Sequence, residues 1–188
     1  PPFPRGLRRI RPWRSAGPFE GVVFGGTAGT VTIGTGGITA DRIRFTTHNY
    51  TIAGETLTLA GAAPTIVVDT ASGERATISA PIAGSDGLVK SGTGELRLSG
   101  ATSNTYGGTT VVTEGTLMLN KSGGAVAVPG ELHITSGANV RFSQNNQIAD
   151  TAAVVMHDIG STFNGTAIHS GYRSGHTETI GSFTMMGG

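Results

Sequence analysis

GLVKSGTGELRLSGATSNTYGGTTVVTEGTLML occupies residues 87–119, and this stretch decides the fold. It contains two short strands of one design, each opening on glycine and placing leucine at alternate positions. The first strand carries Leu96 and Leu98, and the second carries Leu117 and Leu119. A glycine turn and a β-branched run lie between them. A chain that repeats one strand and turn stacks its strands as rungs, so the stretch predicts a solenoid.

The composition supports an all-β protein with many tight corners. Of 188 residues, 31 are glycine and 27 are threonine, which favour turns and strands respectively. Charged residues make up 13%, against about 25% in typical proteins. The net charge is +1, and Val and Ile recur in short alternating runs. Disordered chains usually combine high net charge with few β-branched residues, so this composition predicts an ordered chain.

Three absences in the sequence restrict the class of protein only weakly. Cysteine is absent, which suits export through the periplasm in an unfolded state and suits a cytosolic protein almost equally. No apolar run approaches the roughly 18 residues of a transmembrane helix, so we expect no direct membrane span. The sequence shows no signal peptide at its start, and we expect the interior of a larger precursor.

Residues 1–18 differ from the rest of the chain. They hold five prolines and five of the thirteen Lys and Arg residues, and proline removes backbone donors. We expect a disordered leader or linker here; the alternative is a basic arm for nucleic acid or an anionic surface. Nothing downstream continues the basic character, so we expect no nucleic-acid partner. Residues 19–188 are predicted to form the β-helix.

From residue 19 the pattern predicts short strands and no helix of ten residues. The glycine-led leucine motif recurs at 55–61 and 130–134, with irregular spacing that allows rungs of roughly 15–25 residues. Aromatic residues are 6%, too few for a typical sandwich core. We therefore predict a parallel β-helix of seven or eight short rungs. The predicted strands are 29–33, 42–45, 50–52, 56–59, 65–69, 76–79, 88–90, 95–98, 109–112, 116–119, 131–134, 139–142, 152–156 and 179–185.

The central stretch resembles the autotransporter-associated β-strand repeat, also called the passenger-associated transport repeat. The positions that carry this resemblance are Leu88, Lys90, Gly92, Gly94, Leu96, Leu98, Gly100, Asn104, Tyr106, Gly107, Gly108, Thr109, Gly115, Thr116 and Leu117. Two departures fall in the turn: a small insertion at Thr102–Ser103, and a missing residue between Tyr106 and the glycine pair. The flanks resemble the same proteins more loosely, over about residues 37–188.

The resemblance implies a right-handed parallel β-helix in the passenger of a Gram-negative type V secretion protein. It implies secretion or display on the cell surface, and a C-terminal outer-membrane β-barrel in the same precursor as the expected partner. In that family the repeat is linked to translocation and stacking, and not to a reaction. We therefore expect a structural segment that supports translocation and surface display.

The residues themselves do not indicate an active site. A β-helical polysaccharide lyase or hydrolase needs clustered carboxylates, and the twelve acids are dispersed, with no Asp-x-Asp. His157, Asp158, His169 and His176 lie within twenty residues without a known ligand spacing. We therefore expect no catalytic, cofactor-binding or metal-binding residues and no cofactor. Lys90 is expected at a strand start, facing solvent.

Two alternatives to a purely structural role remain open. A surface adhesin binding glycans or host proteins predicts exposed aromatic residues grouped on one face, for which Tyr50, Tyr106, Phe163 and Tyr172 are the candidates. An enzyme predicts at least three acids converging in a groove. Residues 157–178 break the predicted strand rhythm and concentrate His, Tyr and Arg, so a specific function is most expected there.

Overall fold

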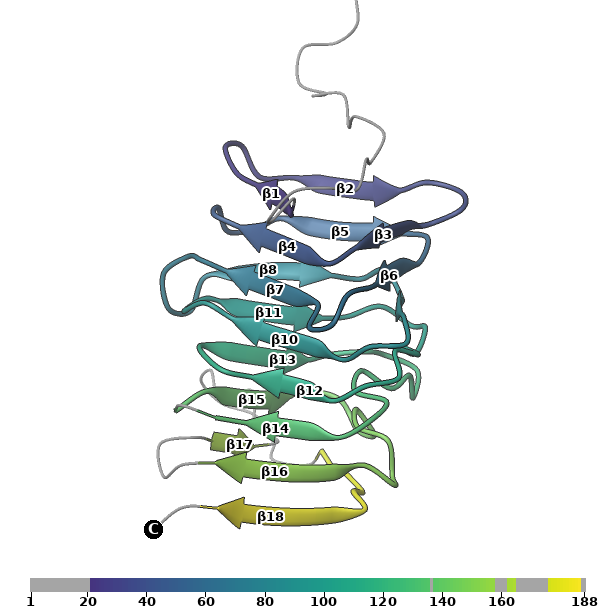
Figure 1. Ribbon diagram of the computed structural model, residues 1–188, viewed down its shortest axis with the longest axis vertical. Helices are drawn as coiled ribbons and strands as arrows, with labels where there is room; N and C mark the ends of the chain where they lie inside the picture. Colours follow the sequence, from purple (N-terminus) through teal and green to yellow (C-terminus); the bar gives the residue numbers. More distant parts are fainter. Residues whose placement is uncertain (1–20, 136, 158–161, 165–175, 187–188) are drawn as a thin grey trace, which may run out of the picture.

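The computed structural model describes residues 21–135, 137–157, 162–164 and 176–186, and these form a parallel β-solenoid. Figure 1 shows the rungs stacked along the long axis from the N-terminal to the C-terminal part of the chain. The described residues contain strands, turns and bends but no helix, and hence none able to cross a membrane. The all-β parallel architecture predicted from the sequence is confirmed.

The strands line three faces of the solenoid. The first sheet runs in the order β1 (Val22–Phe24), β4 (Arg42–Phe45), β7 (Thr65–Val68), β10 (Leu88–Ser91), β12 (Thr110–Val112), β14 (Leu132–Ile134), β16 (Ala153–His157) and β18 (Ser182–Met186). The second runs β2 (Thr30–Ile33), β5 (Thr51–Gly54), β8 (Arg75–Ile78), β11 (Glu95–Leu98), β13 (Thr116–Leu119), β15 (Asn139–Phe142) and β17 (Thr162–Asn164). The third contains β3 (Ile38–Ala40), β6 (Leu57–Leu59) and β9 (Ile82–Ala83).

Successive rungs pair in register, so like residues stack in columns through the core. One column on the second sheet contains Ile78, Leu98, Leu119 and Phe142. All four side chains are at most 6% exposed. Burying one such side chain stabilises a fold by roughly 1.5–3 kcal/mol. The alternate leucines of the opening motif therefore supply the apolar contacts between rungs.

Most predicted strands are confirmed within one or two residues. The sequence pattern does not predict β1, β3, β9 and β17, because each contains only two or three residues and shows no readable alternation. The expectation that residues 157–178 interrupt the strands is wrong at β17, which pairs with β15. Residues 1–18 lie outside the described residues, so the predicted domain boundary stays a prediction.

A column of close approaches precedes the strands of the first sheet. A Cβ atom on Gly87 would lie 2.0 Å from the carbonyl oxygen of Thr109, and one on Gly108 would lie 2.4 Å from the amide nitrogen of Gly87. Neighbouring rungs therefore meet backbone to backbone at this corner. Only glycine fits without moving one rung away from the next.

We predict that Gly87→Ala lowers the free energy of unfolding by about 1–3 kcal/mol, because the added methyl overpacks this corner. The matched control is Gly29→Ala, since a Cβ there meets nothing within 4 Å. Urea unfolding followed by circular dichroism measures both. Equal stability of the two variants would show that the corner can widen at little cost.

Candidate functional site

The polar residues of the repeat turn into the solenoid and bind the backbone of neighbouring rungs. Lys90 is the clearest case, because it is 0% exposed. Its Nζ donates to the carbonyl oxygens of Ser91 at 2.9 Å, Gly92 at 2.7 Å and Glu114 at 3.0 Å. The first two belong to its own rung and the third to the next. One ammonium group thus satisfies three carbonyls and joins two rungs.

The expectation that Lys90 faces solvent is wrong. Lys90 pairs with Ile66 on one side and Val112 on the other, and both of these are fully buried. It therefore occupies a place in an apolar core column. The signal was present in the sequence: Leu88 and Lys90 are two residues apart, and strand alternation places such residues on one face.

Lys121 repeats this arrangement one rung further along. It is 1% exposed, and its Nζ donates to the carbonyl oxygens of Ser99 at 3.0 Å and Thr102 at 2.7 Å. Lys90 and Lys121 are the only lysines in the sequence, and every other basic residue except histidine is arginine. Both lysines therefore donate hydrogen bonds to backbone carbonyls of the stacked rungs.

Side-chain amides connect rungs on the third face, beyond the end of its regular sheet. The Oδ1 atom of Asn104 accepts from the amide of Ile82 at 2.9 Å, and its Nδ2 donates to the carbonyl of Ala127 at 2.8 Å. Asn104 is 2% exposed. It thus joins the rung before it to the rung after it, replacing ladder bonds that a continuous strand would make.

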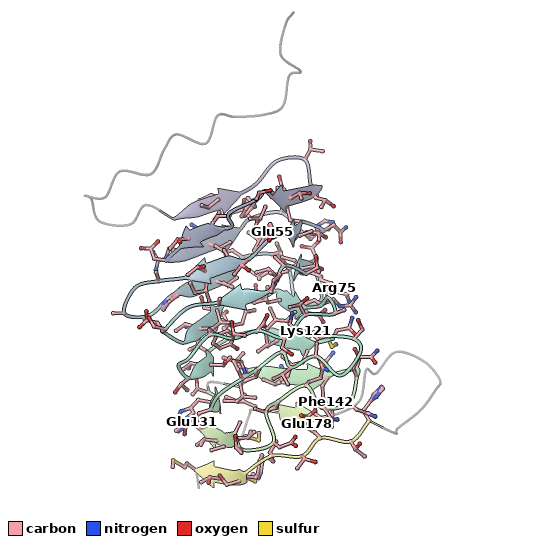
Figure 2. The ribbon with its side chains drawn as sticks, turned by 90° about the vertical axis from the view of Figure 1, so that its right-hand side faces the viewer. Glu55, Arg75, Lys121, Glu131, Phe142 and Glu178 are labelled. Atoms are coloured by element: carbon pink, nitrogen blue, oxygen red, sulfur yellow. The ribbon has the colours of Figure 1, made fainter. Side chains whose placement is uncertain are left out.

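Gln147 continues this connection from Lys121 to Glu178, and these last two residues are labelled in Figure 2. Gln147, 0% exposed, accepts from the amide of Lys121 at 2.7 Å and donates to its carbonyl at 3.0 Å. The Glu178 carboxylate accepts from the amides of Gln147 at 2.8 Å and Ile148 at 2.7 Å. Desolvation raises the pKa of Glu178, and the two amide bonds partly oppose that shift.

Tyr106 fills the core beside this line of amides. It is 1% exposed, and its hydroxyl lies 2.7 Å from the hydroxyl of Thr110. Desolvation raises the pKa of the Tyr106 hydroxyl. Tyr50 is also buried and donates to the carbonyls of Gly25 and Thr27 at 2.8 Å. Neither tyrosine contributes to an exposed aromatic face. Tyr172 and the side chain of Phe163 lie outside the described residues.

Several carboxylates each pair with one basic side chain, and Glu95 does so while only 6% exposed. Asp69 accepts from Arg44, Glu95 accepts from Arg75 at 2.6 Å, and Glu74 lies 3.1 Å from His48. Each of these contacts joins neighbouring rungs. Within the described ranges, no group of three or more His, Cys, Asp or Glu side chains is placed to hold a metal ion.

Of the histidines that the sequence groups together, His157 and His176 contact different residues. His176 contacts the Asn145 side chain at 3.2 Å, whereas His157 contacts His133 at 3.1 Å. Asp158 and His169 lie outside the described residues. The contact between His133 and His157 is not visible in the sequence, because these residues are 24 positions apart and meet only when β14 and β16 pair.

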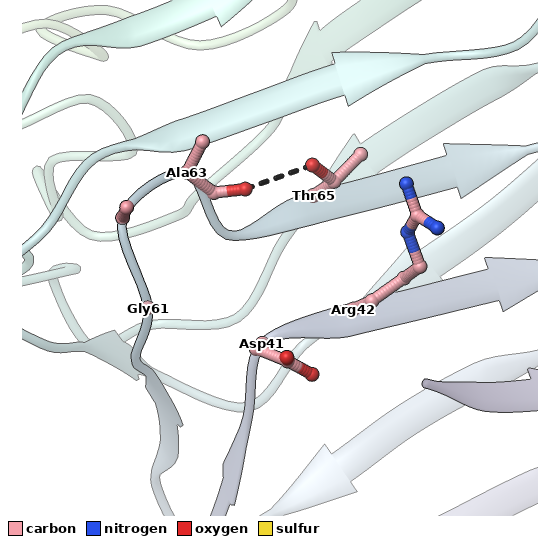
Figure 3. A pocket seen from close by; sticks show the side chains of 6 residues that line it. Asp41, Arg42, Gly61, Ala63 and Thr65 are labelled. Atoms are coloured by element: carbon pink, nitrogen blue, oxygen red, sulfur yellow. Dashed lines mark hydrogen bonds between the residues drawn. The ribbon is translucent and has the colours of Figure 1, made fainter. Parts of the chain in front are cut away.

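One surface pocket lies at the corner between β6 and β7 (Figure 3). Its lining residues are Asp41, Arg42, Gly61, Ala62, Ala63 and Thr65. The Thr65 hydroxyl donates to the carbonyl of Ala63 at 2.9 Å, a contact within the turn itself. The lining offers a single carboxylate, which is not the acid and base pair that glycoside hydrolysis requires.

Comparison with known proteins agrees with this geometry. Residues 88–119 match the model of the passenger-associated transport repeat. Over 131 residues, 70% of the chain, the sequence is 44% identical to the adhesin BmaC autotransporter of Brucella suis biovar 1 (strain 1330). The chain spans 4% of that relative's length. No solved structure matches the chain. The resemblance identified from the sequence is confirmed.

The two buried lysines predict how stability depends on pH. Desolvation lowers the pKa of Lys90 to about 8, partly opposed by Glu114, and desolvation lowers the pKa of Lys121 to about 8 as well. Their ordinary pKa is 10.5. Above pH 8 the unfolded chain therefore binds more protons than the folded chain, and the free energy of unfolding rises with pH.

We expect this rise between pH 8 and about 9.5, below the range in which Tyr106 of the unfolded chain ionises and reverses the trend. Urea unfolding at several pH values measures it. Lys90→Met and Lys121→Met should each remove about half of the slope. A slope that both variants retain in full would mean that other groups produce it.

Proposed function

We propose that this β-solenoid chain is a segment of an autotransporter passenger, secreted or displayed at the cell surface, and that its function is to form a rigid stalk. In this proposal the segment also supports translocation, because each rung that emerges stacks on the rung already folded. The protein's exposed or surface-displayed part is then held on a rod built from backbone pairing and apolar columns.

One observation carries this proposal: the polar residues of the repeat are used within the stack. Lys90, Asn104 and Tyr106 are at most 2% exposed, and each contacts backbone or side-chain atoms of the solenoid. A catalytic or ligand-binding group has to reach its substrate or ligand. Side chains buried in this way can hold rungs together, and they are not available for another molecule.

Stacking of the rungs also supplies free energy that can draw the unfolded chain outward across the membrane. A folded rung presents unpaired backbone groups and an apolar column end, and the next rung satisfies both when it docks. Each docking buries several aliphatic side chains, worth roughly 1.5–3 kcal/mol apiece before the cost of ordering the chain. Folding outside the membrane then opposes backward sliding of the unfolded chain.

We propose that this segment acts within a longer precursor whose C-terminal outer-membrane domain is its partner in export. The match to an autotransporter relative supports this. We also propose that the segment itself catalyses no reaction. Support comes from carboxylates such as Glu95 and Glu178, which bind groups of the solenoid itself.

An adhesive surface is the second candidate, favoured by the name of the relative. Its place in this chain would be an outer face, such as that of β11 and β15, where Arg97 and Arg141 flank the 5% exposed Met118 of β13. It ranks below the stalk because Tyr50 and Tyr106, two of the expected aromatic contacts, are buried in the core.

A pair of valines on β12 tests the stalk proposal. Val112 is 0% exposed in the core column, whereas its neighbour Val111 faces outward. We predict that Val112→Asp in the full-length precursor reduces surface display severalfold, because an unpaired carboxylate in the core prevents rung stacking. Val111→Asp should leave display near the parent level. Antibody labelling of intact cells measures both.

The levels of precursor in the cell envelope provide the control for expression. If Val112→Asp is displayed as well as Val111→Asp while its purified segment fails to fold, then folding of this segment does not support export. The stalk role would then have to be separated from the translocation role.

A further inference from the structure

We propose that His133 and His157 form a surface site for a divalent transition metal, at the point where β14 and β16 lie side by side. The ions expected are those that imidazole prefers, namely Cu²⁺, Ni²⁺ and Zn²⁺. This departs from the expectation, drawn from the sequence, that the chain has no metal-binding residue. The proposed metal site goes beyond the stalk function, and it does not depend on whether the segment acts as a stalk.

The geometry of the two rings suits a shared ion. The Nε2 atom of His157 lies 3.1 Å from the Nδ1 atom of His133. The ring centroids are 5.0 Å apart and the ring planes are inclined by 39°. Two imidazole nitrogens bound to one tetrahedral zinc ion at about 2.0–2.1 Å lie about 3.3 Å apart. The observed separation therefore requires only a small adjustment.

Glu131 completes the arrangement on the far side of His133. Its Oε1 atom lies 3.1 Å from the Nε2 atom of His133, and its Oε2 atom accepts from the hydroxyl of Thr109 at 3.3 Å. Carboxylates commonly hold the second ring nitrogen of a histidine ligand, which fixes its tautomer and makes the ligating nitrogen more basic. In this structure the Nε2 atom of His133 is buried and makes no hydrogen bond, so the Glu131 carboxylate has to turn toward it before it can act in this way.

In the metal-free chain one hydrogen lies between the facing nitrogens. With Nδ1 of His133 as the donor and Nε2 of His157 as the acceptor, metal binding moves that hydrogen to Nε2 of His133, which lies 3.1 Å from Oε1 of Glu131. The number of protons on the two neutral rings stays the same, and water completes the coordination.

The site is accessible and lies across two rungs. The His133 side chain is 28% exposed and the Glu131 side chain is 44% exposed. Two ligands from different rungs make the ion a clip between β14 and β16, so binding should stabilise the folded chain over the unfolded one. A metal ion outside the cell could thus strengthen this part of the rod.

Isothermal titration of the folded chain with Zn²⁺ and Ni²⁺ tests the proposal. We expect saturable binding of one ion, and a loss of affinity of at least tenfold in both His133→Ala and His157→Ala. Glu131→Gln should weaken binding about tenfold while leaving both ligands in place. Thermal unfolding should show stabilisation by the metal in the parent and none in the two alanine variants.

His48→Ala and His176→Ala are the matched controls, because these histidines lie at other positions and contact Glu74 and Asn145. Both controls should bind as the parent does, with unchanged circular dichroism. Absence of saturable binding in the parent, or binding that survives in the His133→Ala/His157→Ala double variant, would overturn the proposal. An effect of His176→Ala alone would place the site elsewhere and would overturn it equally.

Discussion

The structure depends on satisfying backbone carbonyls at the corners of a narrow stack. Along its straight faces the parallel ladder pairs each backbone group with the next rung, but the ladder stops where the chain turns. Carbonyls buried at such corners without a donor destabilise a fold by about 1–3 kcal/mol each. The Lys90 ammonium supplies three donors to one corner, and Lys121 supplies donors to another.

This constraint links the repeat's sequence to its role. The leucines of residues 88–119 provide the apolar columns, while the lysine, asparagine and tyrosine provide polar contacts that the columns cannot make. Each contact reaches a neighbouring rung or closes a turn of its own rung. The repeat is therefore a unit that is complete only when stacked, which is the property that a stalk and a folding-assisted export segment both require.

The sequence predicted the fold because period-two alternation and glycine turns are local signals. The strands at 95–98 and 116–119 have the predicted bounds, since their leucines alternate and glycine precedes each strand. The third face was less visible, because β9 has two residues and later rungs replace the strand with contacts from Asn104 and Gln147. Those contacts join residues more than 20 positions apart, which no local pattern encodes.

The burial of Lys90 and the contact between His133 and His157 also depend on features that a local sequence pattern does not show. A lysine is almost never fully buried unless it is paired, so Lys90 was expected to face solvent. Strand alternation nevertheless places it on the same inner face as Leu88. His133 and His157 became neighbours only through the register of β14 on β16. Register between rungs depends on loop lengths and on core columns together, and the sequence specifies neither one alone.

The reactivity of the two lysines shows whether they stay buried between the rungs. The chain is treated with an amine-acylating ester, once folded and once in guanidinium, and then digested and analysed by mass spectrometry. If buried lysines hold the rungs together, Lys90 and Lys121 stay unmodified in the folded chain and are both acylated in guanidinium. Acylation of both lysines at similar rates in the folded and unfolded chain would show that they are exposed and do not hold the rungs together.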